Sequence, residues 1–173
     1  MGPIGTDERG EVRPQPVPLA VDVGAMLDEI PGFREQVEGA KAELQARIEG
    51  ELARGRRPRQ LKDRNREAGA TAVTSQDWFY ALGRFSFRVD ATIAYEPTAD
   101  GRPERAIVLY TLHVDDYYDW DRDAVTLPIP HPETGEEIVI SDVQMRRLHV
   151  VGLAREYPIH GRTDLGSTAL PVR

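Results

Sequence analysis

The segment of residues 115–123 is the most chemically distinctive part of this sequence. It holds five aspartates within nine residues, interleaved with two tyrosines and one tryptophan. Carboxylates this close repel one another unless a cation lies between them, and Ca²⁺ and Mg²⁺ are bound in proteins through oxygen ligands. We therefore expect this segment to bind a divalent cation. The expected metal ligands are Asp119, Asp121 and Asp123.

These aspartates match only the beginning of an EF-hand calcium loop. They occupy alternate positions, but Ala124 stands where the loop needs glycine and Pro130 stands where it needs the bidentate glutamate. A complete EF-hand is therefore excluded. The alternative to a cation site is a solvated acidic loop at the end of a strand, with its aromatic residues packed partly against the sheet.

The acidic segment also resembles a known family. The sequence Asp116-x-Tyr118-Asp119 resembles the Asp-x-Tyr-Asp part of the signature of colicin M-like bacteriocins, which cleave the lipid-linked peptidoglycan precursor at its pyrophosphate. The resemblance implies that Asp116, Tyr118 and Asp119 are catalytic residues of a metal-dependent phosphodiesterase. The family signature continues with His-Arg, whereas this chain has Val125 and Thr126 there. The acid–base and phosphate-binding roles would then fall to other residues, for which the candidates are His113, His131, His160 and Arg162.

A second resemblance extends over residues 78–161. Residues 78–83, the acidic segment and residues 152–157 are similar to C-terminal modules of uncharacterised actinobacterial proteins, including secreted toxin-like ones. This similarity implies a secreted, toxin-like effector. Residues 1–18 lack the apolar core of a classical signal peptide, so we expect secretion by another route. The alternative is a non-enzymatic β-rich binding or structural module with an acidic cation-binding loop.

His160 has the most suggestive surroundings among the histidines. It precedes Gly161 and Arg162, and a glycine beside these two residue types lets a phosphate or carboxylate approach the backbone. We therefore place His160 and Arg162 among the candidate catalytic residues. His113 lies in a predicted strand, where a neutral hydrogen-bonded imidazole is the simpler expectation.

Composition narrows the possible functions further. The chain has 173 residues, a formal net charge of −7 and no cysteine, which excludes a disulfide scaffold, a thiol nucleophile and a thiolate zinc site. Ten basic and sixteen acidic residues follow Ala70, and this balance repels nucleic-acid phosphates, so we expect no nucleic-acid partner. The sequence contains no stretch apolar enough to span a membrane, and no nucleotide-binding, serine-hydrolase or zinc-protease motif.

Hydrophobic periodicity predicts an α+β fold. Apolar residues recur every three or four positions over residues 33–53, which predicts an amphipathic helix that stops at Gly55. Alternation over residues 85–95 and an apolar run over residues 106–114 predict a long antiparallel hairpin. Shorter strands are expected at residues 125–129, 137–140 and 157–160. A capping box of Ser141 and Gln144 predicts a helix that continues through about Arg155 and packs on the sheet.

We expect four regions along the chain. These are a disordered leader (residues 1–20), a helical region (21–70), a β-rich domain (71–163) and a loose tail (164–173). Within the helical region, the part from residue 56 is expected to be a polar linker or a frayed extension of the helix. The predicted helix is apolar on one face only, so it needs a partner. That partner is either the β-rich domain, a second copy of the chain, or a larger protein.

Overall fold

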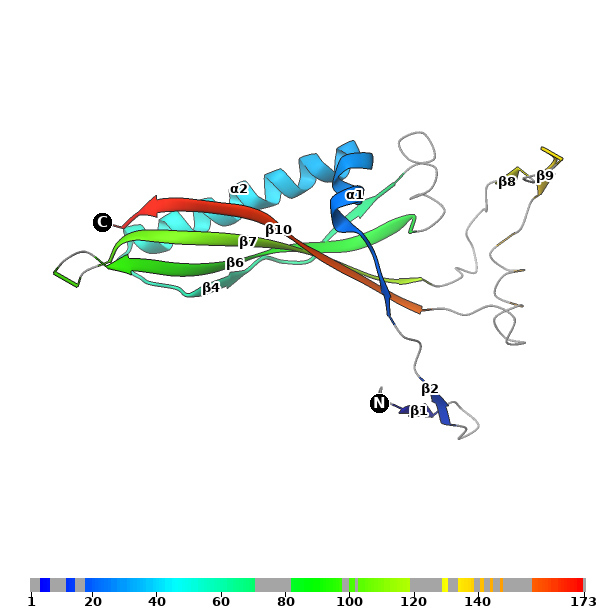
Figure 1. Ribbon diagram of the computed structural model, residues 1–173, viewed down its shortest axis with the longest axis horizontal. Coiled ribbons are helices and arrows are strands. Elements are labelled where there is room, and N and C mark those ends of the chain that lie inside the picture. Colours follow the sequence, from blue (N-terminus) through cyan, green and yellow to red (C-terminus); the bar gives the residue numbers. More distant parts are fainter. Residues whose placement is uncertain are drawn as a thin grey trace. The chain divides into compact units, whose positions relative to one another are not determined.

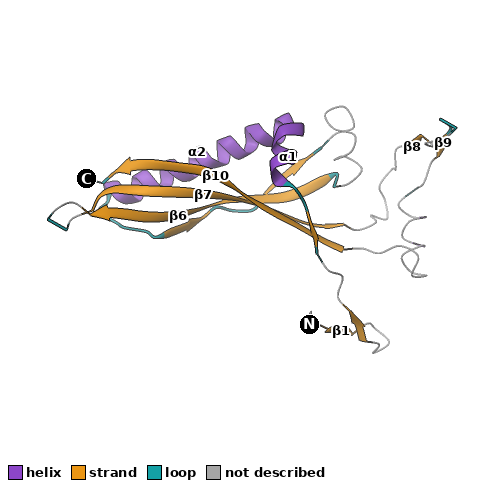
Figure 2. Cartoon of the chain, viewed as in Figure 1, coloured by secondary structure: helices purple, strands orange, loops and turns teal. Residues whose placement is uncertain are grey.

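The computed structural model divides the chain into two compact units. The sheet unit comprises Ala20–Asp116 and Ile159–Arg173, and the second unit comprises Met1–Leu19 and Tyr117–Pro158. The helices and strands are shown in Figure 2. The residues that the structure describes are 4–6, 12–14, 18–70, 82–97, 100, 101, 103–118, 129, 130, 134–138, 141, 144, 147 and 157–172.

Two helices open the sheet unit. Helix α1 (Val23–Glu29) begins after Asp22, whose side chain accepts a hydrogen bond from the Ala25 amide at 3.1 Å. Helix α2 (Pro31–Ala53) begins two residues earlier than its apolar pattern indicated, because proline fits the first helical position, where its missing N–H is not needed. It ends at Ala53, and Gly55, the predicted stop, follows the C-cap Arg54 with a φ of 75°.

The predicted hairpin is confirmed and forms the centre of a six-stranded sheet. Strands β6 (Arg84–Pro97) and β7 (Pro103–Tyr118) pair antiparallel, with Val89 opposite Leu112. Strand β10 (Tyr157–Pro171) lies beside β7, and β3 (Leu19–Ala20) lies beside β10. Strands β4 (Gln60–Lys62) and β5 (Arg66–Gly69) both pair with the other side of β6. With two helices and this sheet, the fold belongs to the predicted α+β class.

Two expectations about polar segments were wrong. The segment after residue 56, expected to be a linker or a helical extension, contains β4 and β5. Residues 164–171, expected to be part of a loose tail, continue β10. In both cases backbone hydrogen bonds to a neighbouring strand hold the segment, and these bonds do not require apolar side chains.

Helix α2 packs along one face of the sheet (Figure 1). The ring of Phe33 meets the rings of Phe85 and Phe87 edge to face, with centroids 5.0 and 5.3 Å apart. Lys41 covers the adjacent part of this face, with its Nζ atom 5.5 Å from the centre of the Tyr110 ring. The apolar face of the helix is therefore buried against the sheet of the same chain, the first of the three partners considered. Its buried residues are Phe33, Val37, Ala40, Leu44, Ile48 and Leu52.

The second unit contains shorter elements. Strand β1 (Ile4–Thr6) pairs antiparallel with β2 (Val12–Pro14), within the predicted leader, and β8 (Ile129–Pro130) pairs with β9 (Glu137–Ile138). The predicted capping box is confirmed: the Gln144 amide donates to Ser141 Oγ at 3.3 Å, and the Ser141 amide donates to Gln144 Oε1 at 2.8 Å. Most of the helix predicted to follow lies outside the described residues, and so does the strand expected at residues 125–129 apart from Ile129, which begins β8.

Candidate functional site

The predicted catalytic and metal-binding residues are only partly described. Asp119, Asp121, Asp123 and His131 lie outside the described residues, and Tyr118 is the last residue of β7. Strand alternation places Asp116 on the same face of β7 as Leu112 and Val114, which point toward α2. His113 therefore points to the opposite face, and the structure does not bring Asp116 and His113 together on one side of the sheet.

The face of the sheet opposite α2, called here the outer face, carries polar side chains from four strands. They line a shallow hollow with a volume of about 220 Å³. The residues that matter for its chemistry are Lys62 on β4, Asp90 and Thr92 on β6, Thr111 and His113 on β7, and Arg162 on β10. The hollow thus combines a carboxylate, an imidazole, two cationic side chains and two hydroxyl groups.

Asp90 is the least exposed charged group of the hollow. Its side chain is 18 % exposed, and its Oδ2 atom accepts a hydrogen bond from Arg88 Nε at 3.1 Å. His113 Nε2 lies 3.5 Å from the same oxygen. The other oxygen, Oδ1, is buried and accepts no hydrogen bond from any described group. A buried acceptor without a partner lowers stability, so such atoms are uncommon in native proteins.

Lys62 and Arg162 bring positive charge to the hollow from the two sides of the hairpin. The register of β4 with β6 places Lys62 directly opposite Asp90. In the described part of the chain, neither Lys62 nor Arg162 forms an ion pair. Two cations without carboxylate partners thus face one hollow in a chain whose net charge is −7. This arrangement can hold an anionic group by charge-assisted hydrogen bonds.

The structure gives Gly161 a packing role. A Cβ atom on this glycine would lie 2.5 Å from Val23 Cγ2 and 2.7 Å from the Val21 carbonyl oxygen. The interpretation of Gly161 as an opening for an anion is therefore wrong, because the start of α1 fills that space. The neighbouring His160 accepts a backbone hydrogen bond from the Val21 amide at 3.0 Å, and its side chain is exposed. Of the predicted pair His160 and Arg162, the hollow includes Arg162.

Sequence reasoning missed Lys62 and Asp90 as site residues. Lys62 was placed in a linker, and Asp90 was one of the polar residues on the exposed side of an alternating strand. A signal for Asp90 was nevertheless present, because aspartate is unfavourable within a strand. No comparable local signal marks Lys62, since it is brought to the hollow only by the pairing of β4 with β6.

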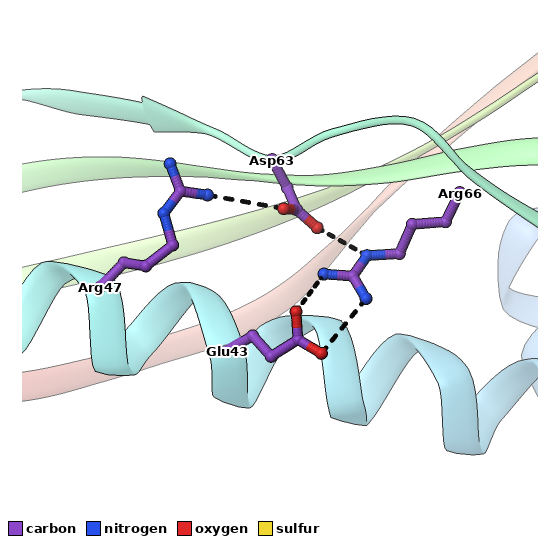
Figure 3. Close-up of polar contacts among 4 residues, drawn as sticks. All are labelled: Glu43, Arg47, Asp63 and Arg66. Atoms are coloured by element: carbon purple, nitrogen blue, oxygen red, sulfur yellow. Dashed lines mark hydrogen bonds and ion pairs between the residues drawn. The ribbon is translucent and has the colours of Figure 1, made fainter.

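A second charged cluster joins α2 to β5 and to the turn that precedes it (Figure 3). Arg66 Nη2 lies 2.7 Å from Glu43 Oε2, and Arg66 Nε lies 2.8 Å from Asp63 Oδ2. Arg47 Nη1 lies 3.5 Å from the other oxygen of Asp63, whose side chain is only 6 % exposed. The hydrogen bond from Arg66 lowers the pKa of Glu43. Every charge in this cluster is paired, so we assign it a structural role.

No protein-family model, curated protein or solved structure matches this chain. Among the described residues, no three histidine, aspartate or glutamate side chains are grouped closely enough to hold a metal ion. Within the same residues, no helix is long and apolar enough to cross a membrane. We argue a function from the outer-face hollow because it gathers two cations that have no ion-pair partner among the described residues.

Proposed function

We propose that this chain is a β-rich binding module that holds a small anionic ligand in the outer-face hollow. The observation that carries the proposal is the convergence of Lys62 and Arg162, each without an ion-pair partner among the described residues. Arginine offers a planar fork of donors to phosphate or carboxylate, and lysine adds a mobile point charge. His113 and Thr92 line the same place and can provide further donors.

The size of the hollow favours a small ligand or a headgroup. Its volume of about 220 Å³ is below the range of about 300–1,000 Å³ that is typical of sites for drug-sized molecules. The net charge of −7 opposes the approach of anions from a distance. Binding therefore depends on short-range contacts with the lining residues, and we expect it to require both cations.

Calorimetric titration with inorganic phosphate and pyrophosphate at low ionic strength tests this proposal. We expect Arg162→Gln and Lys62→Gln each to weaken binding by about tenfold, because each removes one charge-assisted hydrogen bond. The control is Arg105→Gln, which removes an exposed arginine that lies on β7 opposite Glu96, outside the hollow. The proposal fails if neither anion binds at millimolar concentration, or if the control weakens binding as much.

A second candidate function is the metal-dependent phosphodiesterase that the colicin M resemblance implies, in a toxin-like module acting on a lipid-linked pyrophosphate. The position of Asp116 on the opposite face of β7 counts against it, whereas the presence of His113 and Arg162 in one hollow favours it. These residue types suit the two roles left open by the missing His-Arg pair, proton transfer and phosphate contact. A divalent cation, which would polarise a phosphoryl oxygen, is proposed separately for Asp119, Asp121 and Asp123 of the second unit.

Titration with Ca²⁺ and Mg²⁺, combined with a phosphodiester hydrolysis assay, separates the two candidates. The enzyme proposal predicts millimolar or tighter metal binding, and hydrolysis that Asp119→Asn abolishes while the thermal melt stays unchanged. Lost metal binding together with a lower melting temperature would identify Asp119 as a structural ligand instead. If neither ion binds at millimolar concentration, the enzyme proposal fails and the binding proposal is unaffected.

A further inference from the structure

Only one of the two carboxylate oxygens of Asp90 makes a polar contact with another described side chain. Arg88 and His113 both lie beside Oδ2, whereas Oδ1 is buried and has no hydrogen-bond partner among the described residues. Asp90 also forms part of the lining of the hollow. Because the χ2 torsion of an aspartate is soft, a small rotation can aim Oδ1 at a donor in the hollow. Such a donor would recover the free energy that an unpaired buried oxygen costs.

We infer that the ligand of this hollow is an organic anion that also carries a hydroxyl group, such as a phosphorylated polyol. The inference rests on the proposed anion-binding function and specifies its ligand. The anionic group contacts Lys62 and Arg162, and the hydroxyl donates to Asp90 Oδ1. An ammonium group is a poorer donor here, because Lys62, Arg88 and Arg162 already supply positive charge around this carboxylate.

The strand register allows one ligand to contact both the cationic side chains and the carboxylate of Asp90. Lys62 on β4 and Thr111 on β7 are the two cross-strand partners of Asp90 on β6, so Asp90 lies between them. Neighbouring strands are about 4.8 Å apart, so a three-carbon ligand can reach from the lysine to the carboxylate. The hydroxyl of Thr92 lines the same hollow and can bind a further ligand oxygen, whereas the hydroxyl of Thr111 already donates to Asp164.

A matched pair of ligands tests the inference on the unmodified protein. Glycerol 3-phosphate and n-propyl phosphate carry the same charged group on three carbons, and differ in the hydroxyl groups. We expect glycerol 3-phosphate to bind about tenfold more tightly, as one additional charge-assisted hydrogen bond predicts. Glycerate and propionate form a second pair of the same design, which shows whether the hollow takes a carboxylate in place of a phosphate.

The variant Asp90→Asn assigns the preference to a residue. Both phosphates respond equally to the lost charge, so the ratio of their dissociation constants isolates the hydroxyl contact, and we expect this ratio to fall toward one. The control is Asp164→Asn, which removes an equal charge from the same face; Asp164 accepts from Thr111 Oγ1 at 3.3 Å but does not line the hollow. We expect it to leave the ratio at about tenfold.

The possible failures are distinguishable. Equal binding of both phosphates to the unmodified protein overturns the inference but leaves the proposed anion site standing. A preference that persists in Asp90→Asn overturns the assignment of the hydroxyl to Asp90. Failure of all four compounds to bind at millimolar concentration, while phosphate or pyrophosphate still binds, overturns the inference alone. Failure of phosphate and pyrophosphate as well overturns the proposed function too.

Discussion

Gly161→Ala should lower the free energy of unfolding by about 3 kcal/mol, because the added methyl group has no space. It would lie 2.5 Å from a side-chain atom of Val23 and 2.7 Å from the carbonyl oxygen of Val21. The valine methyl can shift, but the carbonyl belongs to backbone that is hydrogen-bonded to β10 through the Val21 amide. Relief of the clash therefore requires α1 to move away from the sheet. Urea denaturation followed by circular dichroism measures the loss.

The matched control is Gly39→Ala in α2. A Cβ atom on Gly39 would meet no atom within 4 Å. The substitution replaces a helix-interior glycine with the best helix former, so it should stabilise the protein by about 0.5–1 kcal/mol. The two glycine substitutions thus have opposite expected signs. A cost below about 1 kcal/mol for Gly161→Ala would contradict the close approach of α1 to β10.

Arg66→Ala should also lower the free energy of unfolding by about 3 kcal/mol, because it leaves a buried carboxylate poorly compensated. Asp63 is 6 % exposed, and the ion pair that would remain to it among the described residues is with Arg47, at 3.5 Å. The substitution also removes the bidentate contact between β5 and Glu43 on α2. Urea denaturation at pH 7 measures the loss of unfolding free energy. We expect the loss because α2 is held less firmly against β4 and β5.

Two variants sharpen this prediction. Arg66→Lys keeps the charge but cannot reproduce the arginine fork, so its cost should lie between zero and that of Arg66→Ala. Arg64→Ala removes an exposed arginine from the same turn and should change stability by less than about 0.5 kcal/mol. Equal effects of Arg64→Ala and Arg66→Ala would show that the paired cluster does not secure the helix to the sheet.

The central elements of the fold were predictable because their signals are local. The alternation over residues 85–95 and the helical spacing over residues 33–53 both reflect one buried face, and each element buries the face that its pattern indicated. The ends with clear stop signals were also predictable, as at Gly55. The capping box of Ser141 and Gln144 was recognisable because both partners lie within one turn.

The missed strands lacked such a signal. Strands β4 and β5 and the second half of β10 are rich in polar and small residues, and little in their own sequence distinguishes them from loops. They are strands because β6 and β7 present unpaired backbone groups that must find hydrogen-bond partners. Gly161 was misread for a related reason: the atoms that require a glycine belong to Val21 and Val23, about 140 positions earlier in the chain.

The sequence alone therefore determined the α+β class, the hairpin, the helix and the acidic segment, since each depends on neighbours a few positions apart. Only the tertiary structure decided which charged residues meet. Lys62, Asp90, His113 and Arg162 come from four strands, and sheet pairing gathers them on one outer face. Their convergence depends on strand register and on backbone hydrogen bonds between distant segments, which side-chain patterns along the chain do not record.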